Sequence, residues 1–136
     1  MEKGYREVPH TADVALEVWG RDLPELFRHA AQGLFSLLAP AKPEAPISAS
    51  REVHLAAPDW ETLLVDWLNE LLALHDEYGE SYITFDLSLP HPYQLTARLG
   101  ATRAFTPGIG IKAATFHDLT IRQEPGGYHT VVVFDV

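Results

Sequence analysis

The chain closes with Thr130-Val131-Val132-Val133-Phe134-Asp135-Val136, the stretch that predicts its fold most directly. Its first five residues are β-branched or aromatic, which is typical of a β-strand. Asp is depleted in strands, yet Asp135 ends this run and the α-carboxylate of Val136 follows. Two carboxylates at a buried strand end repel each other unless a cation or hydrogen-bond donors lie between them. The stretch therefore predicts a strand with a candidate cation site at its end, and fraying of the last two residues into solvent is the alternative.

Two long helices are expected earlier in the chain. Segment 14–20 alternates apolar and polar residues, which predicts a half-buried strand. Asp22 and Asp59 are good N-cap residues, and apolar residues recur after each of them at the spacing of one helix face. We expect the first helix to run from about Asp22 to the proline-rich loop 40–46, and the second from Asp59 to about Tyr78.

The rest of the chain is rich in strand signals. Short strands are expected over 52–56, 82–89, 93–99, 119–123 and 128–135. Helices grouped early and strands grouped late favour the α+β class. We predict a single compact domain over residues 1–136, in which two helices pack on a mixed, mostly antiparallel β-sheet.

Composition limits the classes of protein that this chain can represent. The 136 residues are 46% hydrophobic and include no cysteine, so the chain can build a core but has neither disulfides nor thiolate metal sites. No apolar run approaches the ~18 residues of a membrane span. The first residues lack the apolar region of a signal peptide. We therefore expect a cytoplasmic protein.

The charge balance argues against tight nucleic-acid binding. The formal net charge is −9, with 19 acidic residues against 10 Lys and Arg. Phosphate contacts from Lys and Arg dominate nucleic-acid affinity, and here the arginines are scattered among acids. An acidic surface instead favours cations or a basic protein partner.

Asp13 is the second candidate metal ligand. It stands just before the predicted strand 14–20, where an Asp most often bonds to backbone amides. If it meets Asp135, the two side chains and the terminal carboxylate of Val136 offer only oxygen ligands, which favour Ca²⁺ or Mg²⁺ over zinc or copper. Acidic residues on the second helix are better interpreted as a solvated face. Lys112 follows a glycine-containing loop and, taken alone, is a surface charge.

Five segments together resemble the archease family, and the resemblance covers nearly the whole chain. No single segment is decisive, but all five occur in the family's order, and the proposed ligand positions show no departure from the family pattern. The segments are His10-Thr11-Ala12-Asp13-Val14, Gly20 with Gly33-Leu34-Phe35, Leu64 to Leu72, Ile111 to Leu119, and Val133-Phe134-Asp135-Val136.

The resemblance implies a small α+β protein that assists the RtcB-type RNA ligase in tRNA splicing and RNA repair. Such proteins promote GTP-dependent guanylylation of the ligase, so that it turns over repeatedly, and they carry no ligase chemistry themselves. The family's metal site, usually described as calcium, maps onto Asp13, Asp135 and Val136. The family also suggests that Lys112 lies near that end and takes part in activating the ligase.

Two other functions remain open at this point. One is a metal-dependent hydrolase with Asp13 and Asp135 as metal ligands and His10 or His117 as the base. The other is a general chaperone of RNA-modifying proteins. Hydrolysis of phosphoesters by the isolated protein would favour the first, and binding of unrelated clients would favour the second.

Overall fold

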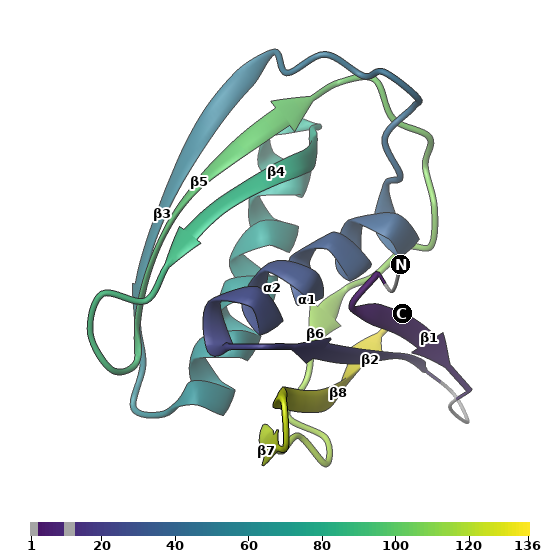
Figure 1. The fold of residues 1–136 in the computed structure, drawn as a ribbon. Helices are drawn as coiled ribbons and strands as arrows, with labels where there is room; N and C mark the ends of the chain where they lie inside the picture. The colour runs from purple at the N-terminus through teal and green to yellow at the C-terminus, as the bar shows by residue number, and fades with distance from the viewer. Residues whose placement is uncertain (1–2, 10–12) are drawn as a thin grey trace.

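The computed structural model describes residues 3–9 and 13–136, in which the strands form two separate sheets with the helices between them (Figure 1). The larger sheet has the order β1-β2-β8-β6, and β7 also pairs with β8. Its strands are β1 (Tyr5–Val8), β2 (Val14–Gly20), β6 (Ala113–Ala114), β7 (Arg122–Glu124) and β8 (Gly127–Asp135).

The smaller sheet has three strands in the order β3-β5-β4. They are β3 (Ala49–Ala56), β4 (Ser81–Ser88) and β5 (Gln94–Thr102). Every strand pair within the described ranges of both sheets is antiparallel. The α+β class with two helices on antiparallel strands is thus confirmed, and the division into two sheets is a feature that the strand signals alone did not predict.

The two helices begin where their caps were expected. Helix α1 (Leu23–Leu38) is capped by Asp22, whose Oδ1 accepts a hydrogen bond of 2.9 Å from the backbone N–H of Glu25. Helix α2 (Trp60–Tyr78) is capped by Asp59, whose Oδ1 accepts one of 2.7 Å from Thr62 N–H. Gly79 ends α2 in the left-handed conformation, with φ of 65°, which glycine adopts without steric cost.

The core lies between the helices and the two sheets. Trp67 of α2 is completely buried, and its indole N–H donates a 3.0 Å hydrogen bond to the backbone carbonyl of Phe27 in α1. This bond satisfies the one polar group of the ring, as a buried tryptophan requires. Other large, fully buried side chains come from both helices and both sheets: Leu16, Leu26, Leu34, Leu63, Leu64, Leu68, Leu71, Leu95 and Phe134.

The strand expected over 119–123 is wrong in its first half. The backbone N–H of Leu119 donates instead to Phe116 O at 3.0 Å, and Asp118 in the turn between them has a φ of 50°. The N–H of Ile121 donates to the side chain of Glu61. These bonds replace strand pairing, and β7 starts only at residue 122.

Neither of the two helices in the described part of the chain is long and apolar enough to cross a membrane.

Candidate metal centre

Strand β8 brings the two ends of the chain together. It lies inside the larger sheet and pairs with β2 from Gly20↔Tyr128 to Val14↔Phe134. Because the register is antiparallel, extending it by one residue brings Asp13 opposite Asp135. The last pair of this register, Val14↔Phe134, leaves the main chains of Asp13 and Asp135 at neighbouring positions, although 121 residues lie between them in the sequence. Residues 10–12, including the His10 of the sequence-based prediction, lie outside the described residues.

The side chains at this end reach solvent. Asp135 is exposed, Val136 is 45% exposed, and Asp13 is partly buried and makes interactions of its own. We call Asp13, Asp135 and the Val136 carboxylate the carboxylate end. Lys112 lies beside it, because its backbone N–H donates a 2.8 Å hydrogen bond to Asp135 O. The expectation from the family that Lys112 is near this end therefore agrees with its position in the main chain.

Helix α2 holds the neighbouring strand β6 through one amide side chain. Asn69 Oδ1 accepts a hydrogen bond of 2.8 Å from Ala114 N–H, and Asn69 Nδ2 donates one of 3.3 Å to Ala114 O. Ala113 and Ala114 in turn pair with Asp135 and Phe134 of β8. Asn69 therefore connects the helix to the strand that contacts the end of β8.

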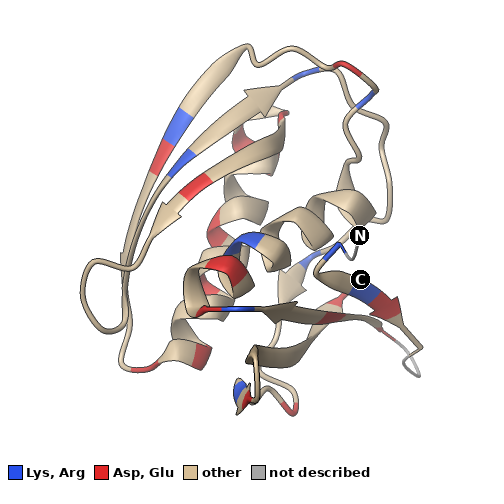
Figure 2. Cartoon of the chain, viewed as in Figure 1, with Lys and Arg blue, Asp and Glu red and all other residues tan. Residues whose placement is uncertain are grey.

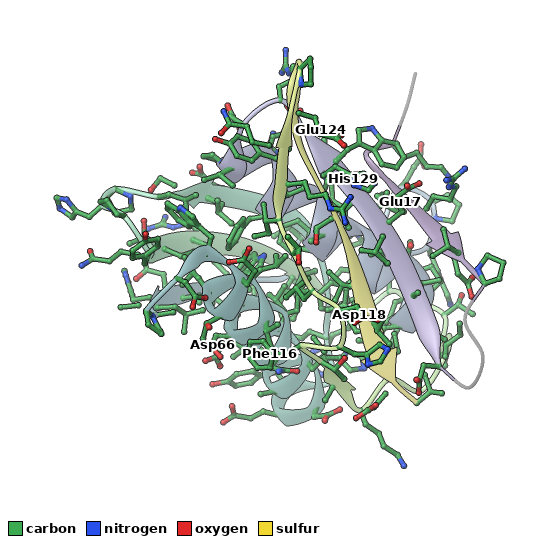
Figure 3. The ribbon with its side chains drawn as sticks, turned by 90° about the horizontal axis from the view of Figure 1, so that it is seen from below. Glu17, Asp66, Phe116, Asp118, Glu124 and His129 are labelled. Carbon is green, nitrogen blue, oxygen red and sulfur yellow. The ribbon has the colours of Figure 1, made fainter. Side chains whose placement is uncertain are left out.

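The loop after β6 is also fixed at both ends. Thr115 donates two hydrogen bonds to Val133 O, from its backbone N–H at 3.0 Å and from its hydroxyl at 2.9 Å. Glu61 of α2 accepts the N–H of Ile121 at 3.0 Å. The loop presents Phe116, whose side chain is 56% exposed, and Figure 3 shows it beside Asp66 of α2. The surroundings of the carboxylate end are thus held by α2 and β8 together.

Three charged or titratable side chains on the larger sheet form one cluster across β1, β2 and β8. Glu17 of β2 accepts a hydrogen bond from His129 Nε2 of β8 at 2.9 Å, and it also forms an ion pair with Arg6 of β1 (Figure 3). The hydrogen bond from His129, with the contribution of Arg6, holds the pKa of Glu17 below its ordinary value. Lys and Arg are scattered among Asp and Glu over both sheets and helices in the view of Figure 2.

The donor set at the carboxylate end fits a hard divalent cation. Two aspartates and one α-carboxylate provide oxygen ligands and excess negative charge, as Ca²⁺ and Mg²⁺ sites require. Within residues 3–9 and 13–136, no three or more His, Cys, Asp and Glu side chains lie close enough together to hold a metal. The expected set holds only two such side chains, Asp13 and Asp135, and therefore falls outside this criterion.

The histidine proposed as a hydrolytic base is placed on the surface. His117 Nε2 lies 3.3 Å from Asp118 Oδ2, and both side chains are largely exposed. Neither His117 nor the carboxylate end lines the two cavities of about 560 and 510 Å³. Neither of these two cavities therefore offers a substrate site next to His117 or the carboxylate end.

Asn69 is the positioning residue that sequence reasoning missed. The sequence predicts one solvated helix face that comprises Asp66, Asn69, Glu70, Asp76 and Glu77. Asp66, Asp76 and Glu77 are exposed, whereas Asn69 and Glu70 are partly buried. A signal was present, because Asn is a poor helix former that favours caps and turns. An Asn between the buried leucines of segment 63–72 therefore indicates a specific hydrogen-bonding role.

Comparison with known proteins gives a consistent result. The sequence model of the Archease protein family (MTH1598/TM1083) matches residues 5–136. The chain is similar to the protein archease of Methanosarcina barkeri, with 33% identity over 98% of this chain and 97% of that protein. It is 32% identical to the protein archease of Saccharolobus solfataricus, over 93% of this chain and 94% of that protein.

Two solved structures share the fold. The solution structure of protein 1598 from Methanobacterium thermoautotrophicum superposes with a TM-score of 0.81 at 27% identity, over 99% of this chain and all of that one. The crystal structure of an archease from Thermotoga maritima, described as a possible chaperone, has a TM-score of 0.69 at 23% identity, over 96% of both chains.

Proposed function

The chain belongs to the archease family, and from this premise we propose that it is a non-catalytic activator of an RtcB-type RNA ligase. In this role it promotes GTP-dependent guanylylation of the ligase and its multiple turnover in tRNA splicing and RNA repair, in the cytoplasm. The observation that supports the proposal is the β2–β8 register, in which Asp13 and Asp135 each lie one residue beyond the last pair, Val14↔Phe134.

Asp13, Asp135 and the Val136 carboxylate are the proposed ligands of a divalent cation, with Ca²⁺ first and Mg²⁺ second. The cation would neutralise the repulsion among these carboxylates. The chain itself supplies the rigidity: Asn69 fixes β6, and Lys112 N–H fixes the end of β8. The proposal takes Val136 as the last residue of the protein.

Contact with the ligase is proposed to occur through this same end. The net charge of −9 favours a basic surface on the partner. Lys112 would lie inside that contact because its main chain touches Asp135, and its ammonium group would then face an anion of the ligase complex. Electrostatic steering of this kind predicts that activation weakens as the salt concentration rises.

The first test is a multiple-turnover RNA ligation assay with the cognate ligase and substoichiometric amounts of this protein. We expect stimulation that is lost in Asp13→Ala and Asp135→Ala and reduced in Lys112→Ala. Asp66→Ala, an exposed change on the outer side of α2, is the matched control and should leave stimulation intact. Absence of stimulation by the well-folded wild-type protein would contradict the proposed function.

The terminal carboxylate has a test of its own. At about 100 times its Kd, a cation that binds only the folded state adds about 2.7 kcal/mol of stability. Thermal unfolding in Ca²⁺ should show that increase for the wild-type chain. A few residues added after Val136 should abolish it, whereas the same residues added at the N-terminus should not. Equal Ca²⁺ responses from the two extended proteins would remove Val136 from the ligand set.

A chaperone role is the second candidate, because one solved protein of this fold is described as a possible chaperone. It predicts binding to several unrelated RNA-modifying proteins, and a dedicated activator should bind the ligase alone. Hydrolysis of a phosphoester by the isolated protein, lost in Asp135→Ala, would instead support the hydrolase.

A further inference from the structure

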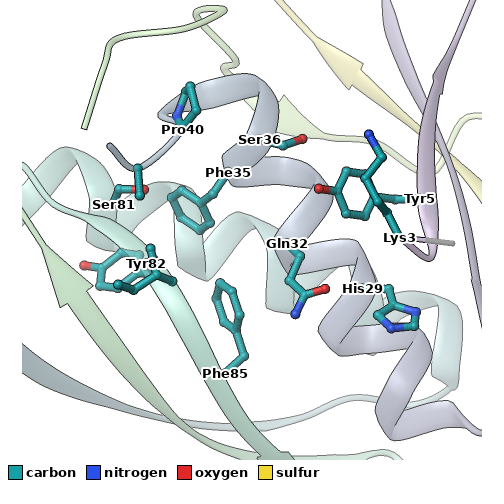
Figure 4. Close-up of a pocket in the computed structure, with 12 residues that line it drawn as sticks. Lys3, Tyr5, His29, Gln32, Phe35, Ser36, Pro40, Ser81, Tyr82 and Phe85 are labelled. Atoms are coloured by element: carbon teal, nitrogen blue, oxygen red, sulfur yellow. The ribbon is translucent and has the colours of Figure 1, made fainter. Parts of the chain in front are cut away.

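A cavity of about 560 Å³ lies between β4 and the exposed side of α1 (Figure 4). Its apolar wall is aromatic: the ring centroid of Phe35 is 5.3 Å from that of Tyr82 and 6.2 Å from that of Phe85. The volume falls in the range of about 300–1,000 Å³ that is typical of ligand sites. We call this cavity the β4 groove. It lies outside the carboxylate end, and none of the roles proposed above uses it.

The groove runs along an open sheet edge. In the described part of the chain β4 pairs with β5 alone, so its other side presents main-chain N–H and C=O groups that no strand pairs. Ser81, Tyr82 and Ile83 all line the groove. Successive strand residues normally point to opposite faces, and a bulge lies between Tyr82 and Thr84. A cavity that touches three residues in a row therefore follows the edge of the strand.

Strand β3, at the other edge of the same sheet, differs from β4 in its charged side chains. Strand β3 carries Arg51, Glu52 and His54, whereas residues 81–85 of β4 carry no charged side chain. Charged residues on an edge strand discourage pairing with another chain. The edge strand without this protection is the one that faces an aromatic groove.

The opposite side of the groove limits what can enter it. Lys3 and Tyr5 line that side, and Tyr5 lies so close to α1 that a Cβ at Gly33 would be 2.9 Å from its Cγ. His29 and Gln32 of α1 line the space between, at the three-residue spacing of one helix face. Because Lys3 and Tyr5 bound the groove on the side opposite β4, its shape favours a single extended segment over the wider edge of a folded sheet.

The lining also indicates the chemistry of the occupant. Ser81, Tyr82 and Phe85 are 0%, 2% and 6% exposed, so the accessible part of this edge is Ile83 and Thr84, and only a short segment of an added strand would pair there. The described lining includes Lys3 and His29 and no Asp or Glu, on a chain with net charge −9. Gln32 makes no hydrogen bond within the described residues, which leaves its amide available to a main chain. A neutral or acidic segment with one apolar side chain is complementary to this surface.

We propose that the β4 groove binds an extended peptide segment of another protein as an added strand beside β4. The main chain of β4 supplies hydrogen bonds, and the pocket formed by Phe35, Tyr82 and Phe85 takes an apolar side chain of the peptide. The proposal does not depend on ligase activation.

The test is a selection of random phage-displayed peptides of about seven residues on the full-length protein, followed by fluorescence anisotropy with the enriched peptides. Ile83→Lys places a charge on the β4 edge, and Gln32→Trp fills the groove without altering β4. His54→Lys on β3 is the matched control. We expect both groove variants to weaken binding about tenfold or more and the control to leave it unchanged.

Two further readouts separate strand addition from other binding. N-methylation of alternate peptide residues should abolish binding, since it removes the N–H groups that pair with β4, and amide NMR shifts should concentrate in residues 81–85. No enriched peptide, or equal binding by wild type and both folded groove variants, would overturn the proposal. So would dimerisation through β4 that excludes the peptides. Gln32→Trp keeps the test valid if Ile83→Lys does not fold.

Discussion

The centre of the molecule and its carboxylate end differ in burial and in how their polar groups are satisfied. In the centre, Trp67 is fully buried and its only polar group is bonded to Phe27 O. At the carboxylate end, Asp135 and Val136 are exposed, and like charges are brought together across a sheet register. Changes in the centre should therefore cost stability, and changes at the carboxylate end should cost function while the fold persists.

The largest expected effect is in the centre. Trp67→Ala should destabilise the protein by about 3–5 kcal/mol, because it opens a cavity in the core and leaves Phe27 O without its side-chain donor. Urea unfolding monitored by circular dichroism measures this directly. Trp67→Phe, which keeps most of the ring volume, should cost less. If Trp67→Ala lowers the free energy of unfolding by less than about 1 kcal/mol, the expected difference between the centre and the carboxylate end is contradicted.

Asn69→Ala tests the connection between the centre of the molecule and the carboxylate end. Its effect on the free energy of unfolding should lie between those of changes in the two regions. It leaves Ala114 N–H and C=O without their side-chain partners, at a cost of about 1–3 kcal/mol. It should also weaken the Ca²⁺-dependent stabilisation, since β6 contacts the end of β8. Asp66→Ala, on the same helix but exposed, should change stability by no more than about 0.5 kcal/mol. Identical Ca²⁺ responses in Asn69→Ala and wild type would show that α2 does not support the carboxylate end.

Acid should weaken the fold through the capped start of α1. Hydrogen bonds from the Arg21 side chain and backbone lower the pKa of Glu25 from 4.5 to about 2. Because the folded-state pKa is depressed, the unfolded chain takes up this proton first, and the stability due to Glu25 is lost as the pH falls from about 4.5 to about 2. Glu25→Gln should flatten the stability profile in that window. Arg21→Ala should remove most of the same pH dependence, and the double variant should add little.

The smallest effect on stability is expected at the carboxylate end. Asp135→Asn removes one negative charge from an exposed position, so in EDTA its free energy of unfolding should equal or slightly exceed that of wild type, within about 0.5 kcal/mol. In Ca²⁺ only the wild-type protein should gain stability. If Asp135→Asn unfolds in EDTA, Asp135 has a structural role and the comparison fails.

Local signals explain which parts of the fold were predictable. Asp22, Asp59 and Gly79 specify helix ends through hydrogen bonds and backbone conformation within a few residues, and both helices were found where these residues predicted. Strands β1 and β6 were missed, because four and two residues are too short for a periodic pattern. Strand β6 also depends on partners 20 and 22 residues further along, Phe134 and Asp135 of β8. Leu119 forms a local turn with Phe116, and the N–H of Ile121 donates to the distant Glu61 instead of to a strand.

The sequence by itself determined the class of the fold, the helix caps, the strand chemistry of 130–134 and the carboxylate at each end of a candidate site. Each depends on side-chain type or on spacing along the chain. Only the tertiary structure decided that Asp13 and Asp135 both follow directly on the last pair of β2 and β8, that Asn69 supports β6, and that β4 faces an aromatic groove. The physical reason is that register, edge exposure and cavities arise from packing between segments far apart in the sequence, and local propensity carries no information about which segments meet.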